Sequence, residues 1–217
     1  MFSIFVYLFS AAVSLWASSY FFRIGKKNNY DLYTAFGTFF FFLGLGFMAP
    51  SLVFFKNPTL FALGGELINF FVLLSFSFVL RALVRFWKVV AISVNSVTIL
   101  GILAACVSLI VSLRYPPIPA FTDGLIYWHY ALPSSIVYLG LLTCYTAAMG
   151  MTFFYNLKNI KERKIQVVYL GLAFLIGGAS GLPLVAFNVF WALVLGFTLL
   201  FITFVLVTLF LLNARPI

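Results

Sequence analysis

Seven long apolar runs follow one another along the chain, and each break between them holds charge, proline or asparagine. A helix that crosses a membrane needs about 20 mainly apolar residues. Each run therefore predicts one transmembrane helix. The expected helices are residues 2–22, 33–54, 60–82, 88–112, 131–155, 166–187 and 190–212.

The composition indicates that the solvent around this chain is lipid. Of 217 residues, 65% are hydrophobic, 20% are aromatic and 8% are charged, whereas a soluble domain is about 25% charged. Seven helices of spanning length take up roughly 140 to 160 residues, which leaves only short loops. The sequence predicts an all-α membrane protein, with one bundle of seven transmembrane helices as a single domain over residues 1–217.

The basic residues predict how the bundle is oriented. On the helix assignment above, only Lys56 and Arg114 fall on the side that holds the N-terminus. The other eleven fall on the opposite side, and cytoplasmic loops carry the excess of lysine and arginine. The expected topology is therefore N-out and C-in. The eleven residues are Arg23, Lys26, Lys27, Arg81, Arg85, Lys88, Lys158, Lys161, Arg163, Lys164 and Arg215.

The net charge of +9 bears on the partners of the protein. The basic residues stand at helix ends and do not form one folded basic face, which argues against nucleic acid as a partner. Their expected partners are anionic lipid headgroups at the cytoplasmic face. Docking of a cytoplasmic protein at the same residues is the second interpretation.

The longest outer connection, about residues 113–130, contains Pro116, Pro117 and Pro119, which favour an extended chain. It ends in Tyr-Trp-His-Tyr at positions 127–130, a pattern typical of an interfacial aromatic belt. The sixth and seventh helices are joined by a very short turn. They should therefore form a tight antiparallel pair.

Glu66 is the acidic residue that falls inside a predicted helix. Burying a carboxyl group in hydrocarbon is costly, so such residues face the bundle interior. Asn69 lies on the same helical stripe three residues later. Two interpretations stay open: a ligand contact or protonatable switch, and a hydrogen-bonded carboxyl group that holds helices together.

His129 and Trp128 complete the candidate ligand-binding residues, with Glu66 and Asn69. His129 is either a pH sensor or ligand contact near the outer mouth, or an interfacial neighbour of the aromatic residues around it. One histidine with Cys106 and Cys144, which lie at different depths, does not make a zinc site. We expect no catalytic residues, no metal and no cofactor, and hence no enzyme.

A basic loop follows the first helix, and a basic segment, Lys161–Gly171, leads into the sixth. A proline, Pro183, comes late in that helix. This order resembles the seven-helix N-terminal module of bacterial sensor histidine kinases and diguanylate cyclases. The resemblance covers the whole chain and implies a sensor in the bacterial cytoplasmic membrane. No kinase or cyclase segment precedes Ile217, so we expect a stand-alone relative or an output domain on another polypeptide.

The first functional hypothesis is therefore a receptor-like module. It would bind a small or lipophilic ligand between the outer halves of the third to sixth helices and pass a helix shift to a cytoplasmic partner. Pro183 is a hinge in this hypothesis, and otherwise a packing kink or helix end. The alternatives are a small transporter, a channel, or an accessory or packing subunit of a membrane complex.

Overall fold

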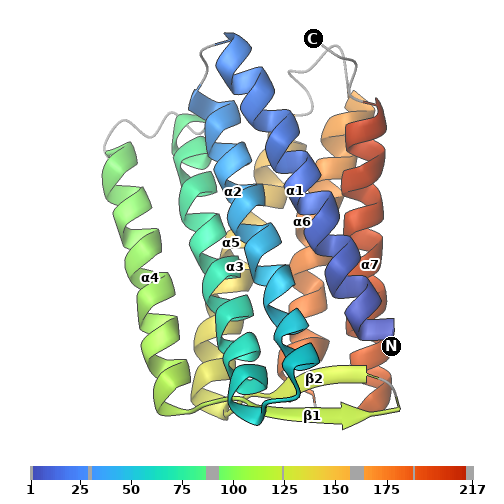
Figure 1. The fold of residues 1–217 in the computed structure, drawn as a ribbon. Helices are drawn as coiled ribbons and strands as arrows, with labels where there is room; N and C mark the ends of the chain where they lie inside the picture. The colour runs from blue at the N-terminus through green and yellow to red at the C-terminus, as the bar shows by residue number, and fades with distance from the viewer. Residues whose placement is uncertain are drawn as a thin grey trace.

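The computed structural model describes residues 2–28, 31–86, 93–123, 125–156, 164–187 and 189–213. Over these ranges the chain forms seven α-helices, each with a stretch long and apolar enough to cross a membrane. This confirms an integral membrane protein built as a seven-helix bundle (Figure 1). The elements are α1 Phe2–Asn28, α2 Asp31–Met48, the 3-10 helix η1 Ala49–Phe55, α3 Pro58–Phe86, α4 Val94–Arg114, β1 Ile118–Thr122, β2 Leu125–His129, α5 Leu132–Asn156, α6 Lys164–Val185 and α7 Phe190–Asn213.

Several helices differ from the prediction at their ends: α3 extends to Phe86 and not 82, and α4 begins at Val94 and not 88, after the extended Ser93. Helix α1 continues six residues beyond the predicted end at 22 and carries Lys26 and Lys27 in its last turn, where basic residues complement the helix dipole. The second predicted helix is divided, because α2 ends at Met48 and the chain tightens into η1. Pro50 stands in the first turn of η1, and proline has no N–H for an α-helical hydrogen bond.

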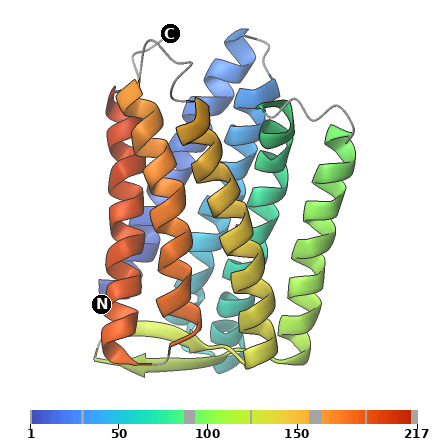
Figure 2. The ribbon, with the colours of Figure 1, turned by 180° about the vertical axis from the view of Figure 1, so that it is seen from behind.

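Six helices form a closed ring. Neighbours in it are α1 and α2, α2 and α3, α3 and α5, α5 and α6, α6 and α7, and finally α7 and α1. The predicted pairing of the sixth and seventh helices is confirmed. Helix α4 stands outside the ring against α3 and, to a lesser extent, α5, and Figure 2 shows it apart at the edge of the bundle.

Small residues attach α4 to the ring. Its buried stripe consists of Gly101, Ala105, Ser108 and Ser112. A Cβ atom at position 101 would come within 2.8 Å of the Cα of Ser77 in α3, so the two backbones approach closely, as small residues allow in membranes. The opposite face of α4 is apolar and exposed, with Ile110 at 65%, and suits contact with lipid tails.

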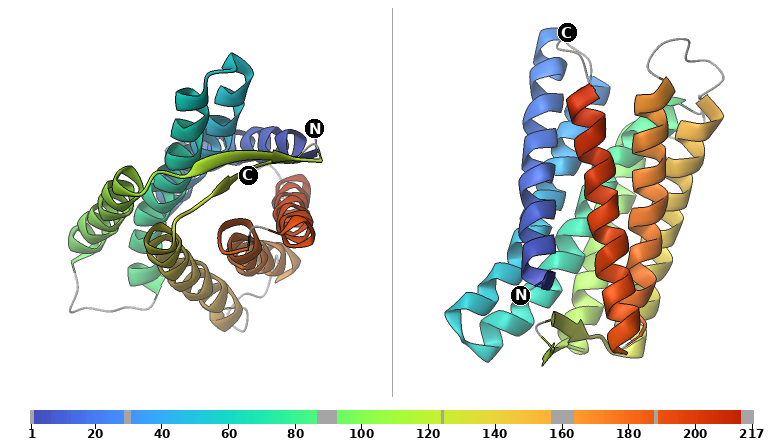
Figure 3. Two further views of the ribbon diagram at one scale, coloured as in Figure 1. Left: turned by 90° about the horizontal axis from the view of Figure 1, so that it is seen from below. Right: turned by 90° about the vertical axis from the view of Figure 1, so that its right-hand side faces the viewer.

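The connection between α4 and α5 forms an antiparallel β-hairpin, paired from Ile118 with His129 to Thr122 with Leu125. Figure 3 shows the hairpin lying across one end of the ring. The backbone N–H of Ile126 donates to Oγ of Ser3 at 2.7 Å, which fastens β2 to the start of α1. The prolines predicted an extended chain here, but not its pairing into a hairpin over the bundle.

The two ends of the bundle differ in charge. At the end opposite the hairpin lie Arg23, Lys26, Lys27 and Lys164, while Lys56 and Arg114 lie at the hairpin end. Five further residues used in the orientation argument lie outside the described residues: Lys88, Lys158, Lys161, Arg163 and Arg215. The N-out, C-in topology therefore stays a prediction.

Candidate functional site: a central cavity under the hairpin

A cavity of about 110 Å³ lies at the centre of the ring. Its walls come from α1, α2, α3, α5, α6, α7 and β2, and helix α4 contributes no residue to it. The ligand region predicted from the sequence, between the third and sixth helices, therefore differs from the observed cavity. The first two helices and the last one share in the wall because the ring closes between α7 and α1.

Phenylalanines form the floor of the cavity, on the side away from the hairpin. The ring centroid of Phe39 lies 5.2 Å from that of Phe76 and 5.4 Å from that of Phe174. Phe153 stacks on Phe174 at 5.7 Å. Phe39 and Phe76 are 2% and 4% exposed. Phe39, Phe76 and Phe174 thus give this part of the cavity an aromatic wall.

Trp128 of β2 forms the roof. Its side chain is 2% exposed, and its Nε1–H donates to the carbonyl oxygen of Phe61 at 2.8 Å. The indole also meets the rings of Phe61 and Tyr7 edge-on, at centroid distances of 5.2 and 6.2 Å. Trp128 is therefore inserted into the bundle and does not lie in an interfacial belt, the interpretation that its sequence neighbours favoured.

Gly65 in α3 makes room for this tryptophan. A Cβ atom at position 65 would lie 2.5 Å from Cδ1 of Trp128 and 2.7 Å from its Nε1, closer than such atoms can approach. The absence of a side chain at 65 lets the indole rest directly on the α3 backbone. The glycine pair at 64 and 65 thus serves the contact between the hairpin and α3.

Polar groups gather just below the roof. Asn69 is 4% exposed, and its Nδ2 has no hydrogen-bond partner among the described residues. Leaving such a buried donor unsatisfied costs about 1–3 kcal/mol. Tyr7, Tyr130 and Tyr138 line the same end of the cavity, and the hydroxyl of Tyr130 donates to the carbonyl oxygen of Gly65 at 3.0 Å.

The phenol of Tyr130 stays neutral. Burial raises its pKa well above the ordinary value, and the neighbouring Tyr7 and Tyr138 raise it further. A buried phenol that does not ionise can act only as a neutral hydrogen-bonding group. The polar end of the cavity therefore offers hydroxyl and amide groups.

Deeper in the cavity, the polar side chains are already satisfied. Their hydroxyls donate to carbonyl oxygens of their own helices, as Thr146 does at 2.8 Å, Ser180 at 2.7 Å and Thr203 at 2.9 Å. No charged residue belongs to the wall in the part of the chain that the structure describes. The lower cavity is thus apolar towards a ligand, even where its residues are polar.

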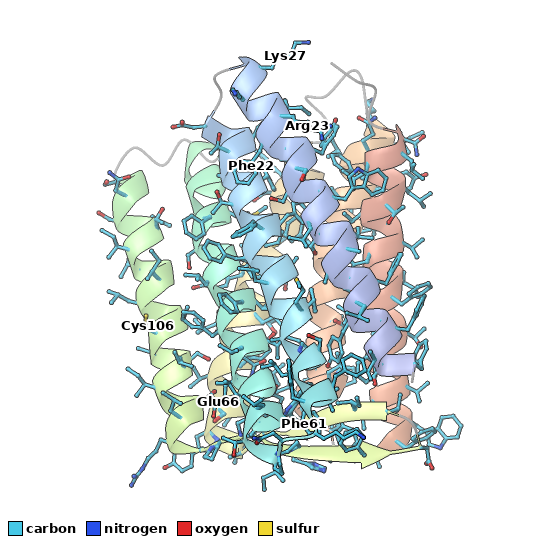
Figure 4. All side chains as sticks on the ribbon, in the orientation of Figure 1. Phe22, Arg23, Lys27, Phe61, Glu66 and Cys106 are labelled. Carbon is cyan, nitrogen blue, oxygen red and sulfur yellow. The ribbon has the colours of Figure 1, made fainter. Side chains whose placement is uncertain are left out.

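The four sequence-predicted candidates divide into two pairs. Asn69 and Trp128 line the cavity, whereas Glu66 and His129 do not. Glu66 is 7% exposed and lies in the half of the bundle next to the hairpin (Figure 4). Its carboxyl group makes no hydrogen bond or ion pair with any described residue. His129 is partly exposed, and its ring meets that of Tyr127 at 5.0 Å. The ligand-binding roles of all four stay predictions.

Sequence reasoning named Trp128 but missed the phenylalanines and the tyrosines that line the cavity with it. Tyr7 and Tyr138 stand in helices where nothing in the local pattern separates a cavity position from a lipid-facing one. Cys106 and Cys144 are free thiols outside the wall. Among the described residues, no group of His, Cys, Asp and Glu could hold a metal ion.

In comparisons with known proteins, no protein-family model, curated protein or solved structure matches the chain. What defines its class is therefore the fold itself. The chain is a seven-helix integral membrane protein with a largely apolar cavity, lined by residues of a six-helix ring and of the hairpin.

Proposed function

We propose that this protein is a receptor-like membrane module that binds a small lipophilic ligand in its central cavity and signals to a cytoplasmic partner. One observation carries the proposal: a cavity at the centre of the ring, lined by Trp128 under the hairpin and by Phe39, Phe76 and Phe174 further along. A largely apolar cavity with a few polar groups is the ordinary form of a small-molecule site.

The size of the cavity supports a slim ligand. An engineered apolar cavity of about 150 Å³ stays dry and binds benzene, and the cavity here, at about 110 Å³, is of the same order. Its wall runs from Tyr130 near the hairpin down to Leu170 and Val207. A narrow chain such as an alkyl group fits this elongated space better than a broad ring system.

The apolar lining of the cavity favours a receptor over the alternative of a channel or transporter. A conducting path needs polar or charged groups that replace the hydration shell of the solute. Transporters hold their substrates with broken helices and polar groups near the middle of the membrane. In the described wall no residue is charged, and the hydroxyls of Thr146, Ser180 and Thr203 are turned to their own helices.

Helix α6 is the best-placed element to carry a signal. Gly177 and Gly181 lie on the cavity wall, and Pro183 stands in the last turn of the helix. A ligand shifts a conformational equilibrium only if it contacts the two states differently, and wall residues without side chains let a ligand touch the helix backbone. In the N-out, C-in topology, the other end of α6 reaches the cytoplasmic face of a bacterial membrane, next to anionic lipids.

Binding can be measured with Trp128 as the reporter. In a background with phenylalanine at the other tryptophan positions, 16, 87 and 191, the fluorescence reports on the roof of the cavity alone. The protein is placed in nanodiscs of dioleoylphosphatidylcholine and titrated with 1-bromononane, whose bromine quenches on contact. We expect saturable quenching, whereas nanodiscs made of dibrominated phosphatidylcholine should leave the buried indole bright.

A matched pair of substitutions tests where the probe binds. Val72→Phe fills the wall at a residue that is 5% exposed, and Val107→Phe makes the same change on the outer face of α4, at 52% exposure. The first should abolish saturable quenching and the second should preserve it. Quenching that does not saturate, or that is equal in both variants, would refute the cavity as a binding site.

A further inference from the structure

The two ends of the cavity suit different chemical groups of a ligand. The floor is built from phenylalanine rings, and the deeper hydroxyls are satisfied within their own helices. The unpartnered Nδ2 of Asn69 lies at the other end, close to the roof. A molecule that fills the cavity therefore meets an apolar surface along most of its length and one free donor near Trp128.

The free donor is unusual because its surroundings are otherwise satisfied. The Tyr130 hydroxyl donates to the carbonyl of Gly65, and the indole of Trp128 donates to that of Phe61. The Tyr130 hydroxyl oxygen is the polar group next to the Asn69 side chain, but Nδ2 of Asn69 makes no hydrogen bond within 3.5 Å to it or to another described residue. Buried polar groups are almost always hydrogen-bonded in folded proteins. A donor left open on a cavity wall points to an acceptor supplied by a ligand.

We infer that the ligand is an uncharged, slim lipophile with a hydrogen-bond acceptor oxygen at one end, such as a carbonyl group, which Asn69 binds below the hairpin. This inference rests on the proposed function and names the chemical class of its ligand. The acceptor end lies beneath Trp128, and the apolar tail extends towards the rings of Phe39 and Phe174.

Two related ligand classes fit the wall less well. A plain alkane fills the apolar part but leaves Asn69 without a partner. A carboxylate would supply an acceptor, but the described wall contains no lysine, arginine or histidine to balance its charge, and burying an unpaired anion is strongly unfavourable. A neutral oxygen satisfies the amide without bringing a charge into the bundle.

Three nine-carbon probes separate these classes: 2-nonanone, nonane and nonanoate. Each competes with 1-bromononane for the single-tryptophan protein, and each affinity is corrected for partitioning of the probe into the nanodisc lipid. We expect 2-nonanone to bind about 2- to 12-fold more tightly than nonane, the range that one net hydrogen bond provides. Nonanoate at pH 8 should bind more weakly than 2-nonanone.

Two variants of similar shape locate the hydrogen bond. Asn69→Leu should remove the preference for 2-nonanone over nonane. Thr146→Val removes a wall hydroxyl that already donates to Leu142, so it should keep the preference. Infrared spectra of 2-nonanone carrying a ¹³C carbonyl should show the C=O band at lower frequency in the wild-type protein than in Asn69→Leu, because hydrogen bonding weakens that bond.

The outcomes distinguish this inference from the function on which it rests. Equal binding of 2-nonanone and nonane to the wild type, with an unshifted carbonyl band, would overturn the inference while binding in the cavity stands. If 1-bromononane itself does not bind saturably, the proposed function is overturned as well. The infrared measurement on the wild type decides the point even if Asn69→Leu does not fold.

Discussion

The contact between Gly65 and Trp128 gives the sharpest test of how the hairpin is held. In Gly65→Ala, the added methyl group would lie 2.5 Å from Cδ1 and 2.7 Å from Nε1 of the indole, so the ring must move. Overpacking costs about 1–3 kcal/mol, and loss of the hydrogen bond to Phe61 costs about 0.5–1.5 kcal/mol. The better helix propensity of alanine returns about 1 kcal/mol. We expect a net loss of about 0.5–3.5 kcal/mol of unfolding free energy.

The matched control is Gly140→Ala in α5, where an added Cβ atom would meet nothing within 4 Å. It should leave stability unchanged or raise it by up to about 1 kcal/mol. Unfolding is followed by titration with sodium dodecyl sulfate in mixed micelles. Near-ultraviolet circular dichroism reports whether the indole has left its site. If both variants match the wild type within about 0.5 kcal/mol, a value typical of neutral changes, the roof does not depend on Trp128 resting against α3.

Three further predictions concern the serines of α1, the buried acid and the topology. Ser18→Ala should cost about 0.5–1.5 kcal/mol, because the hydroxyl donates to a carbonyl of α2 at 2.9 Å. Ser14→Ala should be neutral or stabilising in the same titration, because its buried hydroxyl has no partner among the described residues. Glu66→Leu should not lower the thermal stability, since no described residue bonds the carboxyl group; a loss of about 1–2 kcal/mol would favour the helix-holding interpretation. On a background without native cysteines, an impermeant maleimide should label Lys56→Cys in intact cells and Lys27→Cys only in opened ones, and the reverse pattern would refute the N-out topology.

The seven helices could be predicted from the sequence because the membrane imposes one simple requirement on each of them. A run of about 20 apolar residues is visible without any knowledge of neighbours. The break after Met48 was not visible in that pattern. The segment from Asp31 to Phe55 is apolar enough to be taken as one span. Pro50 interrupts the α-helical hydrogen bonds within it, and this effect on the backbone leaves no trace in the hydropathy.

The site was harder to predict because it depends on which helices are neighbours. The rarity of polar residues inside the predicted spans was enough to single out Asn69, and it lies on the cavity wall. The same reasoning singled out Glu66, which is buried but lies off the wall. The hairpin was missed although its signal is present: Asp123-Gly124, a dipeptide typical of two-residue hairpin turns, stands between the paired residues Thr122 and Leu125. The role of Trp128 could not be predicted, because it depends on a glycine 63 positions earlier in the chain.

The bond between Ser3 and Ile126 joins positions 123 residues apart, and this has a consequence for biosynthesis. At about 5–20 residues per second, a ribosome needs roughly 6 to 25 s to travel from one position to the other. Helix α1 therefore enters the membrane long before its hairpin partner exists. Its serines that are buried in the folded protein, Ser3, Ser10, Ser14 and Ser18, are not yet fully covered at that stage. It gains its other neighbour, α7, only when the final helix is made. The cavity does not exist in any shorter nascent chain, so its ligand either enters the finished protein or is enclosed as the last helix arrives.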